Sequence, residues 1–350
     1  MTTLFIDSTS KIDVSGKGYL GGYPGGVNGV SIGRTLGNTT AGGSTSSNGG
    51  GYGGLGGSGN ATYGDYANPN DVGSGGGGLY ISYYGSYYAG GNGGGYINIS
   101  AQTINLSGSI VANGGSGGYG GAGSGGGIRI DAGTLTGSGS ISAKGGLSTS
   151  TWAYANAGGG GRIAIYYDDL SLPTANIAAS GGIGGGAPYN GGAGTVYLKV
   201  KSASTGTLFV DNKNSLTSYP STPLATVNDE VVITGQAQIQ MADGSILNKR
   251  TTITGAATLF ANRLAVASGN ELVIDGGNLY GDAGEITADT VTVRNSGLIT
   301  HGGATTTVLV QRDLDFQAVC DRHSQTEEST CARSVTTTPQ KRRFASSNVT

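Results

Sequence analysis

Short segments in which apolar and polar residues alternate recur along the chain at nearly fixed spacing. In the first 200 residues they follow glycine runs, in GGGYINI, GGGIRI, GGRIAI and GAGTVYL, and they centre on Ile97, Ile128, Ile163 and Val196. The spacings between these residues are 31, 35 and 33. Strict alternation over a few residues is typical of a half-buried β-strand. The pattern therefore predicts one strand at each of these positions.

Each repeat has two further apolar positions. The second follows after seven residues, at Ile104, Leu135 and Leu170, and the third after 13 or 14, at Ile110, Ile141 and Ile177. After Val196 the second position is Ala203, but Phe209 follows at 13 and is assigned to the third position. Residues 201–310 repeat the same pattern every 19 to 21 residues, with first positions at Ile233, Ile253, Ile274 and Val293. Their second positions are Ile239, Leu259, Leu279 and Leu298, and their third positions are Ile246, Leu264 and Ile286.

A unit of three short strands cannot bury its apolar side chains alone, but stacked units can, each pairing in parallel with the next. The repeat therefore predicts an all-β fold, a parallel β-helix (solenoid). The extra residues of the first half fall between the third strand and the next first strand, where the glycine runs lie. These inserted loops are expected to form a layer along one edge. A β-sandwich, which also consists of short strands and turns, is the alternative fold.

Glycine divides the chain into three regions. Of 71 glycines, 59 lie in residues 1–200, 12 in 201–310 and none in 311–350. We predict coils with long Gly/Tyr-rich insertions in 1–200, coils of about 20 residues without them in 201–310, and an atypical polar tail in 311–350. The tail holds Cys320 and Cys331, and the sequence leaves open whether it folds and whether these cysteines form a disulfide. The start, MTTLFIDSTS, lacks the features of a signal peptide and opens in a strand pattern, as expected for a segment of a longer protein or a mature chain.

The stretch AGGGGRIAIYYDDLS, residues 157–171, shows how one repeat is expected to fold. Its glycines end an inserted loop, and Ile163 and Ile165 mark the first strand. Asp168 and Asp169 are expected to turn the corner, because aspartate favours turns, and Leu170 to begin the second strand. Arg129 and Arg162 are assigned to equivalent outward positions on neighbouring coils.

The segments GGGGRIAIYY, GGAGTVYLK and GSIVANGG resemble glycine-rich repeats of very large secreted or surface proteins of bacteria. These adhesin-like proteins have right-handed, pectin-lyase-like β-helices. The resemblance covers about residues 1–310, and the tail departs from it. It implies a right-handed β-helix, an extracellular or cell-surface location and a non-catalytic structural or adhesive role, without naming a ligand.

Charge and motif spacing narrow the classes of partner. The net charge is −2 and only 11% of residues are charged, with no basic block, so nucleic acid is not an expected partner. No apolar run approaches the length of a membrane helix, so membrane insertion is not expected. The glycine runs precede strands instead of opening helices, which argues against a nucleotide loop, and they lack the aspartates of calcium-binding repeats. No cofactor or metal is expected.

Catalytic groupings are sparse. Asp131 and Asp168 on successive coils would form a carboxylate pair of the kind used in glycoside hydrolysis, and this pair carries the alternative of a carbohydrate-active β-helix. The two histidines, His301 and His323, have no recognisable partner motif. No catalytic residue is assigned, and the chain is expected not to be an enzyme.

Tyrosine is concentrated where glycine is. Seventeen of the 19 tyrosines precede residue 198, and YISYYGSYY holds five of them. Tyrosine offers a large contact area and a polar tip at low entropic cost, and its ring suits sugar stacking. The alternative is that these rings pack on glycine backbone and order the loops. The candidate binding surface is Tyr80, Tyr83, Tyr84, Tyr87, Tyr88, Tyr119, Tyr154 and Tyr189.

These observations predict a structural or adhesive protein. The expected partners are further copies of the chain, other surface or matrix proteins, or glycans. Because the exposed end of a β-helix is an unpaired sheet edge, end-to-end stacking into a filament or matrix is also expected. The alternative is a carbohydrate-binding or carbohydrate-active β-helix.

Overall fold

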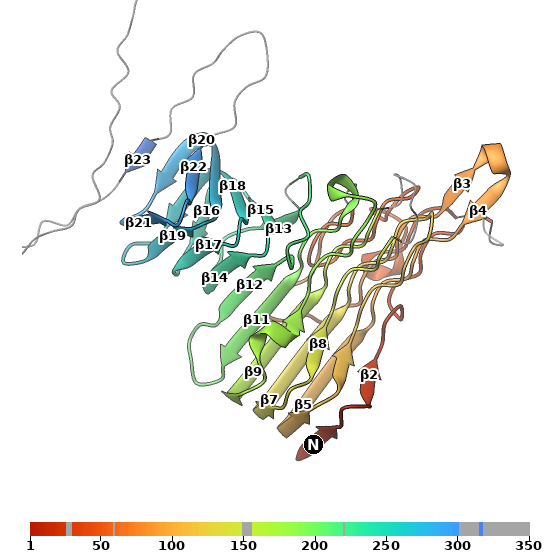
Figure 1. Ribbon diagram of the computed structural model, residues 1–350, viewed down its shortest axis with the longest axis horizontal. Helices are drawn as coiled ribbons and strands as arrows, with labels where there is room; N and C mark the ends of the chain where they lie inside the picture. The colour runs from red at the N-terminus through yellow and green to blue at the C-terminus, as the bar shows by residue number, and fades with distance from the viewer. Residues whose placement is uncertain (26–29, 59, 149–155, 220, 301–314, 318–350) are drawn as a thin grey trace, which may run out of the picture.

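The computed structural model describes residues 1–25, 30–58, 60–148, 156–219, 221–300 and 315–317. The described chain is all-β, and its strands pair almost entirely in parallel (Figure 1). Ten strands form the largest sheet, in the order β1 (Thr3–Ile6), β5 (Tyr96–Leu106), β7 (Gly127–Thr136), β9 (Arg162–Leu170), β11 (Thr195–Val200), β12 (Thr207–Asp211), β14 (Glu230–Thr234), β17 (Thr251–Thr254), β19 (Glu271–Asp275) and β21 (Thr290–Arg294).

Two smaller parallel sheets accompany the large one. A four-stranded sheet belongs to the first part of the chain: β2 (Lys11–Asp13), β6 (Ser109–Val111), β8 (Ser140–Ser142) and β10 (Ile177–Ala178). A seven-stranded sheet belongs to the second part: β13 (Thr222–Leu224), β15 (Gln238–Met241), β16 (Ser245–Leu247), β18 (Thr258–Val266), β20 (Asn278–Thr287), β22 (Leu298–Thr300) and β23 (Asp315–Gln317). A separate hairpin consists of β3 (Leu79–Ile81) and β4 (Ser86–Tyr88).

The strands of successive repeats pair in register. Ile97, Ile128, Ile163 and Val196 form one rank across the large sheet, and Ile110, Ile141 and Ile177 form a rank in the four-stranded sheet. Ile128, Ile163, Ile110 and Ile141 are all fully buried. Each repeat thus buries the apolar residues of the one before it, as the spacing predicts.

The prediction of three short strands per unit is wrong for the first part of the chain. There the first and second apolar positions belong to one long strand, so that Ile97 and Ile104 both lie in β5. Asp168 and Asp169 do not turn a corner, because β9 continues through them to Leu170. Pairing with β7 keeps this segment extended, and that pairing is stronger than the local turn preference of aspartate.

The chain reverses direction between β11 and β12. These two strands are antiparallel neighbours, and Val196 pairs with Phe209. The assignment of Phe209 to the third position of a continuing coil is therefore wrong: it lies in the large sheet. All strands after β12 in this sheet run parallel to one another and antiparallel to β1–β11.

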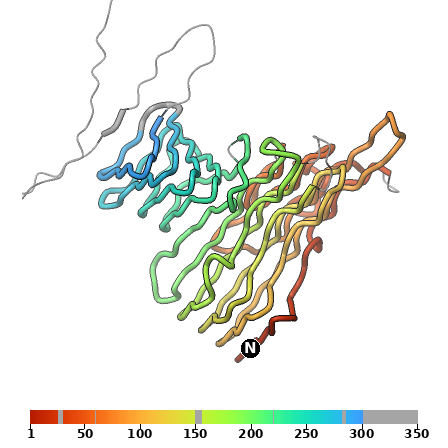
Figure 2. The backbone as a smooth tube through the Cα atoms, viewed as in Figure 1, coloured from red at the N-terminus to blue at the C-terminus, as the bar shows by residue number. Residues whose placement is uncertain are grey.

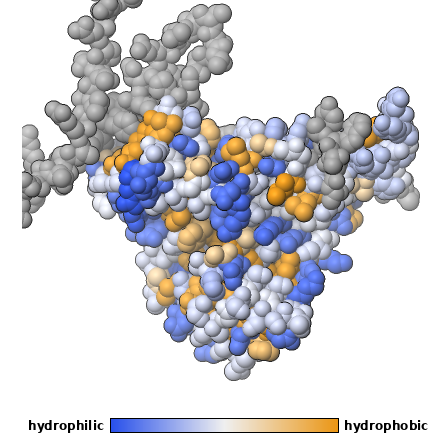
Figure 3. Space-filling model, in the orientation of Figure 1, coloured by the Kyte–Doolittle hydropathy of each residue, from blue (hydrophilic) through white to orange (hydrophobic). Residues whose placement is uncertain are grey.

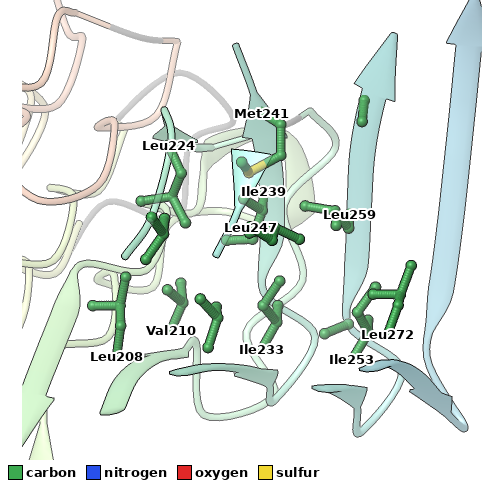
Figure 4. Packing of buried hydrophobic residues seen from close by; sticks show 14 of the residues in the cluster. Leu208, Val210, Leu224, Ile233, Ile239, Met241, Leu247, Ile253, Leu259 and Leu272 are labelled. Atoms are coloured by element: carbon green, nitrogen blue, oxygen red, sulfur yellow. The ribbon is translucent and has the colours of Figure 1, made fainter. Parts of the chain in front are cut away.

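The apolar core changes face of the large sheet at the same point. Val196 and Leu198 belong to the core of the first part, against which Phe209 also packs. Tyr197, which points to the opposite face, belongs with Leu208 to the core of the second part. Figure 4 shows this second core, with side chains of the large sheet facing those of the seven-stranded sheet. The two cores therefore lie on opposite faces of one continuous sheet.

Two of the apolar positions predicted from the repeat in residues 201–310 do not face the core, and the residue that follows each of them does. Ile246 is 39% exposed, and the neighbouring Leu247 fills the core instead. Leu298 is exposed, and Ile299 packs against the core. In short strands a shift of one residue exchanges the two faces, so a pair of adjacent apolar residues leaves the inward one undecided.

The glycine runs form a layer of extended segments that hydrogen-bond to one another (Figure 2). In segment 121–126 successive backbone N–H groups donate hydrogen bonds to three neighbouring segments in rotation. Residues 121 and 124 donate to segment 73–78, residues 122 and 125 to segment 156–161, and residues 123 and 126 to segment 112–115. Segment 156–161 repeats the rule with three neighbours of its own, namely 189–192, 143–146 and 47–50.

A repeat of three residues per turn without internal hydrogen bonds is that of a polyproline II helix. Each such segment is thus held from three sides, and the neighbouring backbones approach closely. A Cβ atom on Gly160 would lie 1.8 Å from the carbonyl oxygen of Ala179, and one on Gly191 would lie 1.9 Å from that of Gly158. Glycine is required here for close backbone approach, and only the absence of a side chain permits the packing.

Two glycine-to-alanine substitutions in the layer should show whether stability depends on close backbone approach or on the loss of a glycine as such. In Gly160→Ala the added methyl group meets backbone that cannot move aside, and we expect a loss of about 1–3 kcal/mol or more in the free energy of unfolding. Urea unfolding of the purified variant measures this loss. The matched control is Gly115→Ala, where the nearest backbone atom would lie 3.1 Å from the Cβ. Equal losses in the two variants would contradict the close-approach explanation.

Candidate functional site: an exposed tyrosine hairpin

Strands β3 and β4 form a hairpin that stands out from the glycine layer, visible as the orange arm in Figure 1. Tyr80 pairs with Tyr87 across the two strands, and the turn contains the short 3-10 segment Ser82–Tyr84. Gly85 closes the turn in the left-handed region, with φ 59°, and its N–H donates to the carbonyl of Ser82. Glycine adopts this conformation without a steric penalty, which explains its place in YISYYGSYY.

The hairpin presents its aromatic rings to solvent. Tyr83 is 88% exposed and Tyr84 57%, while Tyr80 and Tyr87 are about half exposed at 48% and 50%. The rings of Tyr80 and Tyr87 stack with centroids 4.6 Å apart, and those of Tyr83 and Tyr84 meet edge to face at 4.9 Å. Stacking holds these rings in place, so the arm presents a preformed aromatic surface.

The base of the hairpin is fixed to the glycine layer. The ring of Tyr88 lies 4.6 Å from that of Tyr119, and Tyr87 lies so close to Gly25 that a Cβ there would be 2.9 Å from the Cβ of Tyr87. In Figure 3 the arm projects from the body of the molecule. Its residues 79–88 include no charged side chain. The surface therefore suits a neutral ligand with hydroxyl or apolar groups.

The structure brings together six of the eight predicted tyrosines: Tyr80, Tyr83, Tyr84, Tyr87, Tyr88 and Tyr119. Tyr189 lies elsewhere, in the short 3-10 segment Ala187–Tyr189, where its carbonyl accepts a hydrogen bond from Ala157. Tyr154 lies outside the described residues, as do His301, His323, Cys320 and Cys331.

A second group of tyrosines, which the sequence did not single out, joins the two parts of the chain. The carboxylate of Asp229 is buried and accepts hydrogen bonds from the hydroxyls of Tyr66 at 2.7 Å and Tyr197 at 3.0 Å, and from the N–H of Gly206 at 2.7 Å. Tyr66 and Asp229 are 163 residues apart in sequence, and no local pattern indicates their contact. The group fixes the β11–β12 hairpin beside the second core.

Tyr66 belongs to a segment, residues 60–72, that we call the strap. The strap crosses the face of the large sheet opposite the first core. The hydroxyl of Tyr166 donates to the carbonyl of Ala67 at 2.6 Å, and the guanidinium of Arg129 donates to the side chain of Asn68. The strap explains why β9 is buried on both faces near its start.

Arg129 and Arg162 are not equivalent, in contrast to the sequence assignment. Arg129 of β7 pairs with Ala164 of β9, whereas Arg162 of β9 pairs with Gly127, which lies two residues before Arg129 in β7. Arg162 is buried, and burial lowers its pKa. Its guanidinium donates to the carbonyl of Tyr63 at 2.9 Å and lies 5.6 Å from the centre of the Tyr52 ring. Arg162 is thus an internal anchor for the strap.

Asp131 and Asp168 do come close to a common point, but that point is occupied by a lysine. Lys201 Nζ lies 2.6 Å from a carboxylate oxygen of Asp131 and 3.8 Å from one of Asp168. Lys201 follows β11, so three neighbouring strands contribute to this ion pair. The arrangement links three neighbouring strands by charge.

Neither a metal site nor a membrane helix is present in the described part of the chain. Among the described residues no three His, Cys, Asp or Glu side chains are grouped so that they could hold a metal ion. No helix there is long and apolar enough to cross a membrane.

Removing one hydroxyl from the Asp229 group should destabilise the fold. In Tyr66→Phe the buried carboxylate loses a hydrogen bond, and we expect a loss of about 1.5–3 kcal/mol in the free energy of unfolding, measured by urea unfolding. Tyr83→Phe is the control, since that hydroxyl belongs to an exposed ring, and it should leave stability unchanged. If Tyr66→Phe were as stable as the control, the strap would not be anchored through Asp229.

The buried tyrosines should make the protein sensitive to alkali. Burial raises the pKa of Tyr52, Tyr63 and Tyr66 above the ordinary value of 10.0, and that of Tyr219 to about 12. The stability that these phenols contribute is complete below pH 10 and is lost as pH rises through the folded-state values, because the unfolded chain ionises first. We expect a slope of about 1.4 kcal/mol per pH unit for each such tyrosine. Urea unfolding at rising pH, with phenolate absorbance followed in parallel, measures it; constant stability through this range would contradict it.

Comparisons with models of protein families, with curated proteins and with solved structures find no match for this chain.

Proposed function

We propose that the chain is a non-catalytic, extracellular adhesive module in which a right-handed parallel β-helix and its glycine layer form a rigid support for the tyrosine hairpin. The exposed, neutral and prestacked rings of the hairpin carry this proposal. Large exposed aromatic surfaces are unfavourable in water and mark interaction sites. Tyrosine is well suited to such sites, because it buries a large area with few rotatable bonds.

The helical part of the proposal rests on the stacking of successive repeats. Parallel crossovers within one sheet are almost always right-handed, so we assign that hand to the coils. At β11–β12 the strand direction and the core face reverse together. Reversing only one of them would invert the hand of the coil, whereas reversing both preserves it. The simultaneous switch is therefore what two right-handed segments on one shared sheet require.

Carbohydrate binding is the second candidate. The hairpin lacks charged side chains, and its ring faces and hydroxyl tips suit a neutral sugar. Catalysis on carbohydrate has less support, since Asp131 and Asp168 are joined to Lys201. End-to-end assembly into a filament stays a prediction, to be checked by electron microscopy of concentrated protein.

The hairpin should carry the adhesive activity. Beads coated with the protein would be passed over arrays of neutral oligosaccharides and of surface and matrix proteins, and retention compared with that of Tyr83→Ser/Tyr84→Ser. We expect retention to fall by at least about tenfold in the double variant, because the most exposed rings are lost. The control is Leu147→Ser/Ile183→Ser, which removes exposed apolar side chains outside the hairpin.

Two results would contradict the proposal. One is equal retention of the hairpin variant and the control on every surface that holds the native protein. The other is release of oligosaccharides from polysaccharide by the purified protein, with loss of that release in Asp131→Asn or Asp168→Asn, which would establish a carbohydrate-active enzyme.

A further inference from the structure

The four-stranded sheet of the first part stops at β10. Its strands follow the order β10-β8-β6-β2, and the rank Ile12, Ile110, Ile141 and Ile177 runs through them. Ile110 and Ile141 are fully buried because each is covered by a neighbouring strand on both sides. Ile177 pairs with a strand on one side only, because β10 is the last strand of the sheet, although this residue is just 4% exposed.

Within the described part of the chain, no segment supplies the next strand of this sheet. After β11 it turns back into β12, and the core continues on the opposite face of the large sheet. A cavity of about 240 Å³ is left beside β10. Ile177, Val196, Leu198 and Phe209 form its apolar wall, and Asp211 and Lys213, paired at 2.8 Å, lie among its lining residues.

We propose that this cavity binds an extended segment of a partner protein, which adds a strand beside β10 and inserts one large apolar side chain. The repeat itself indicates the occupant, because every earlier position of the rank is covered by a strand with an isoleucine in register with it. Addition of a strand at a sheet edge is a recurrent mode of peptide binding, and side-chain pockets give such contacts their specificity.

The size of the cavity agrees with a single side chain of the partner. An engineered apolar cavity of about 150 Å³ binds benzene, so about 240 Å³ accommodates a leucine, isoleucine or phenylalanine side chain. β10 is only two residues long, the N–H of Ile177 already donates to the carbonyl of Thr174, and the N–H of Gly194 donates to the carbonyl of Ala179. The added strand therefore pairs over a short length, and the inserted side chain provides most of the binding energy. The site is separate from the tyrosine hairpin.

A peptide with the sequence of the chain's own preceding strand tests the proposal. The probe is the fluorescent peptide SGSISAKGG, which copies residues 138–146 and places Ile141 in the position of the inserted residue. Binding to the full chain is followed by fluorescence anisotropy. We expect saturable binding, weakened by at least about tenfold when the peptide carries Ile141→Asp, because the buried side chain is lost.

Two matched protein variants locate the binding. Ala175 is exposed and lines the cavity, so Ala175→Trp should fill the entrance and weaken peptide binding by about tenfold or more. Ala203, exposed in the β11–β12 turn, takes the same substitution as the control and should leave binding unchanged. Thermal unfolding verifies that both variants fold.

Peptides that are N-methylated on alternate residues, prepared to block each edge of the strand in turn, test the main-chain contact. One of the two should bind at least about fivefold more weakly than the unmodified peptide. The proposal is overturned if the native-sequence peptide does not bind at millimolar concentration. Binding of toluene would not rescue it, since the cavity would then accept a small molecule but no strand. It is equally overturned if Ile141→Asp, both N-methylated peptides or Ala175→Trp leave the affinity unchanged.

Discussion

The structure depends on backbone segments that approach one another more closely than any side chain would allow. In segments 121–126 and 156–161 of the glycine layer, every amide N–H is bonded to a neighbouring segment, and three neighbours surround each of the two. In water the N–H and C=O groups of an extended chain are hydrogen-bonded to solvent. The layer is therefore stable only where each buried N–H and C=O finds a protein partner instead. Glycine makes this possible at the cost of a large loss of backbone freedom on folding. The flanking strands offset that cost, because their cores hold the ends of each segment in place.

The second determinant is the β11–β12 hairpin, where direction and core face change together. Here β9 and β11 are covered on both sides, by the first core and by the strap or the second core. The contacts at this junction are polar. Asp229 accepts hydrogen bonds from two tyrosine hydroxyls, and Arg162 donates hydrogen bonds to backbone carbonyl groups. Burying such groups without partners costs free energy, and hydrogen bonds to their partners are directional. These contacts therefore favour one arrangement of the two halves.

The sequence predicts the part of the fold that repeats. The repeat pattern predicts the positions of Ile128 and Ile141 correctly, because each repeat presents the same residue type at the same position. The errors occur where a non-local partner decides the outcome. Asp168 is locally a turn residue but stays extended beside β7, and Phe209 has the right spacing but belongs to an antiparallel neighbour.

The candidate site shows the same division. The hairpin of Tyr80 and Tyr87 is local, and a glycine between clustered tyrosines indicates it. The contact between Tyr66 and Asp229 joins residues 163 positions apart, and no periodicity could reveal it. The strap therefore cannot be predicted from local sequence patterns.

The glycine layer also bears on survival among proteases. A protease must draw an extended stretch of chain into its cleft, and exposed loops with small or polar residues are ordinarily where it cuts. Here the extended segments are already bonded on three sides, and drawing one out would break hydrogen bonds to three neighbours at once. Cleavage must then await the opening of a whole cooperative unit, which makes the most flexible amino acid the source of resistance to digestion.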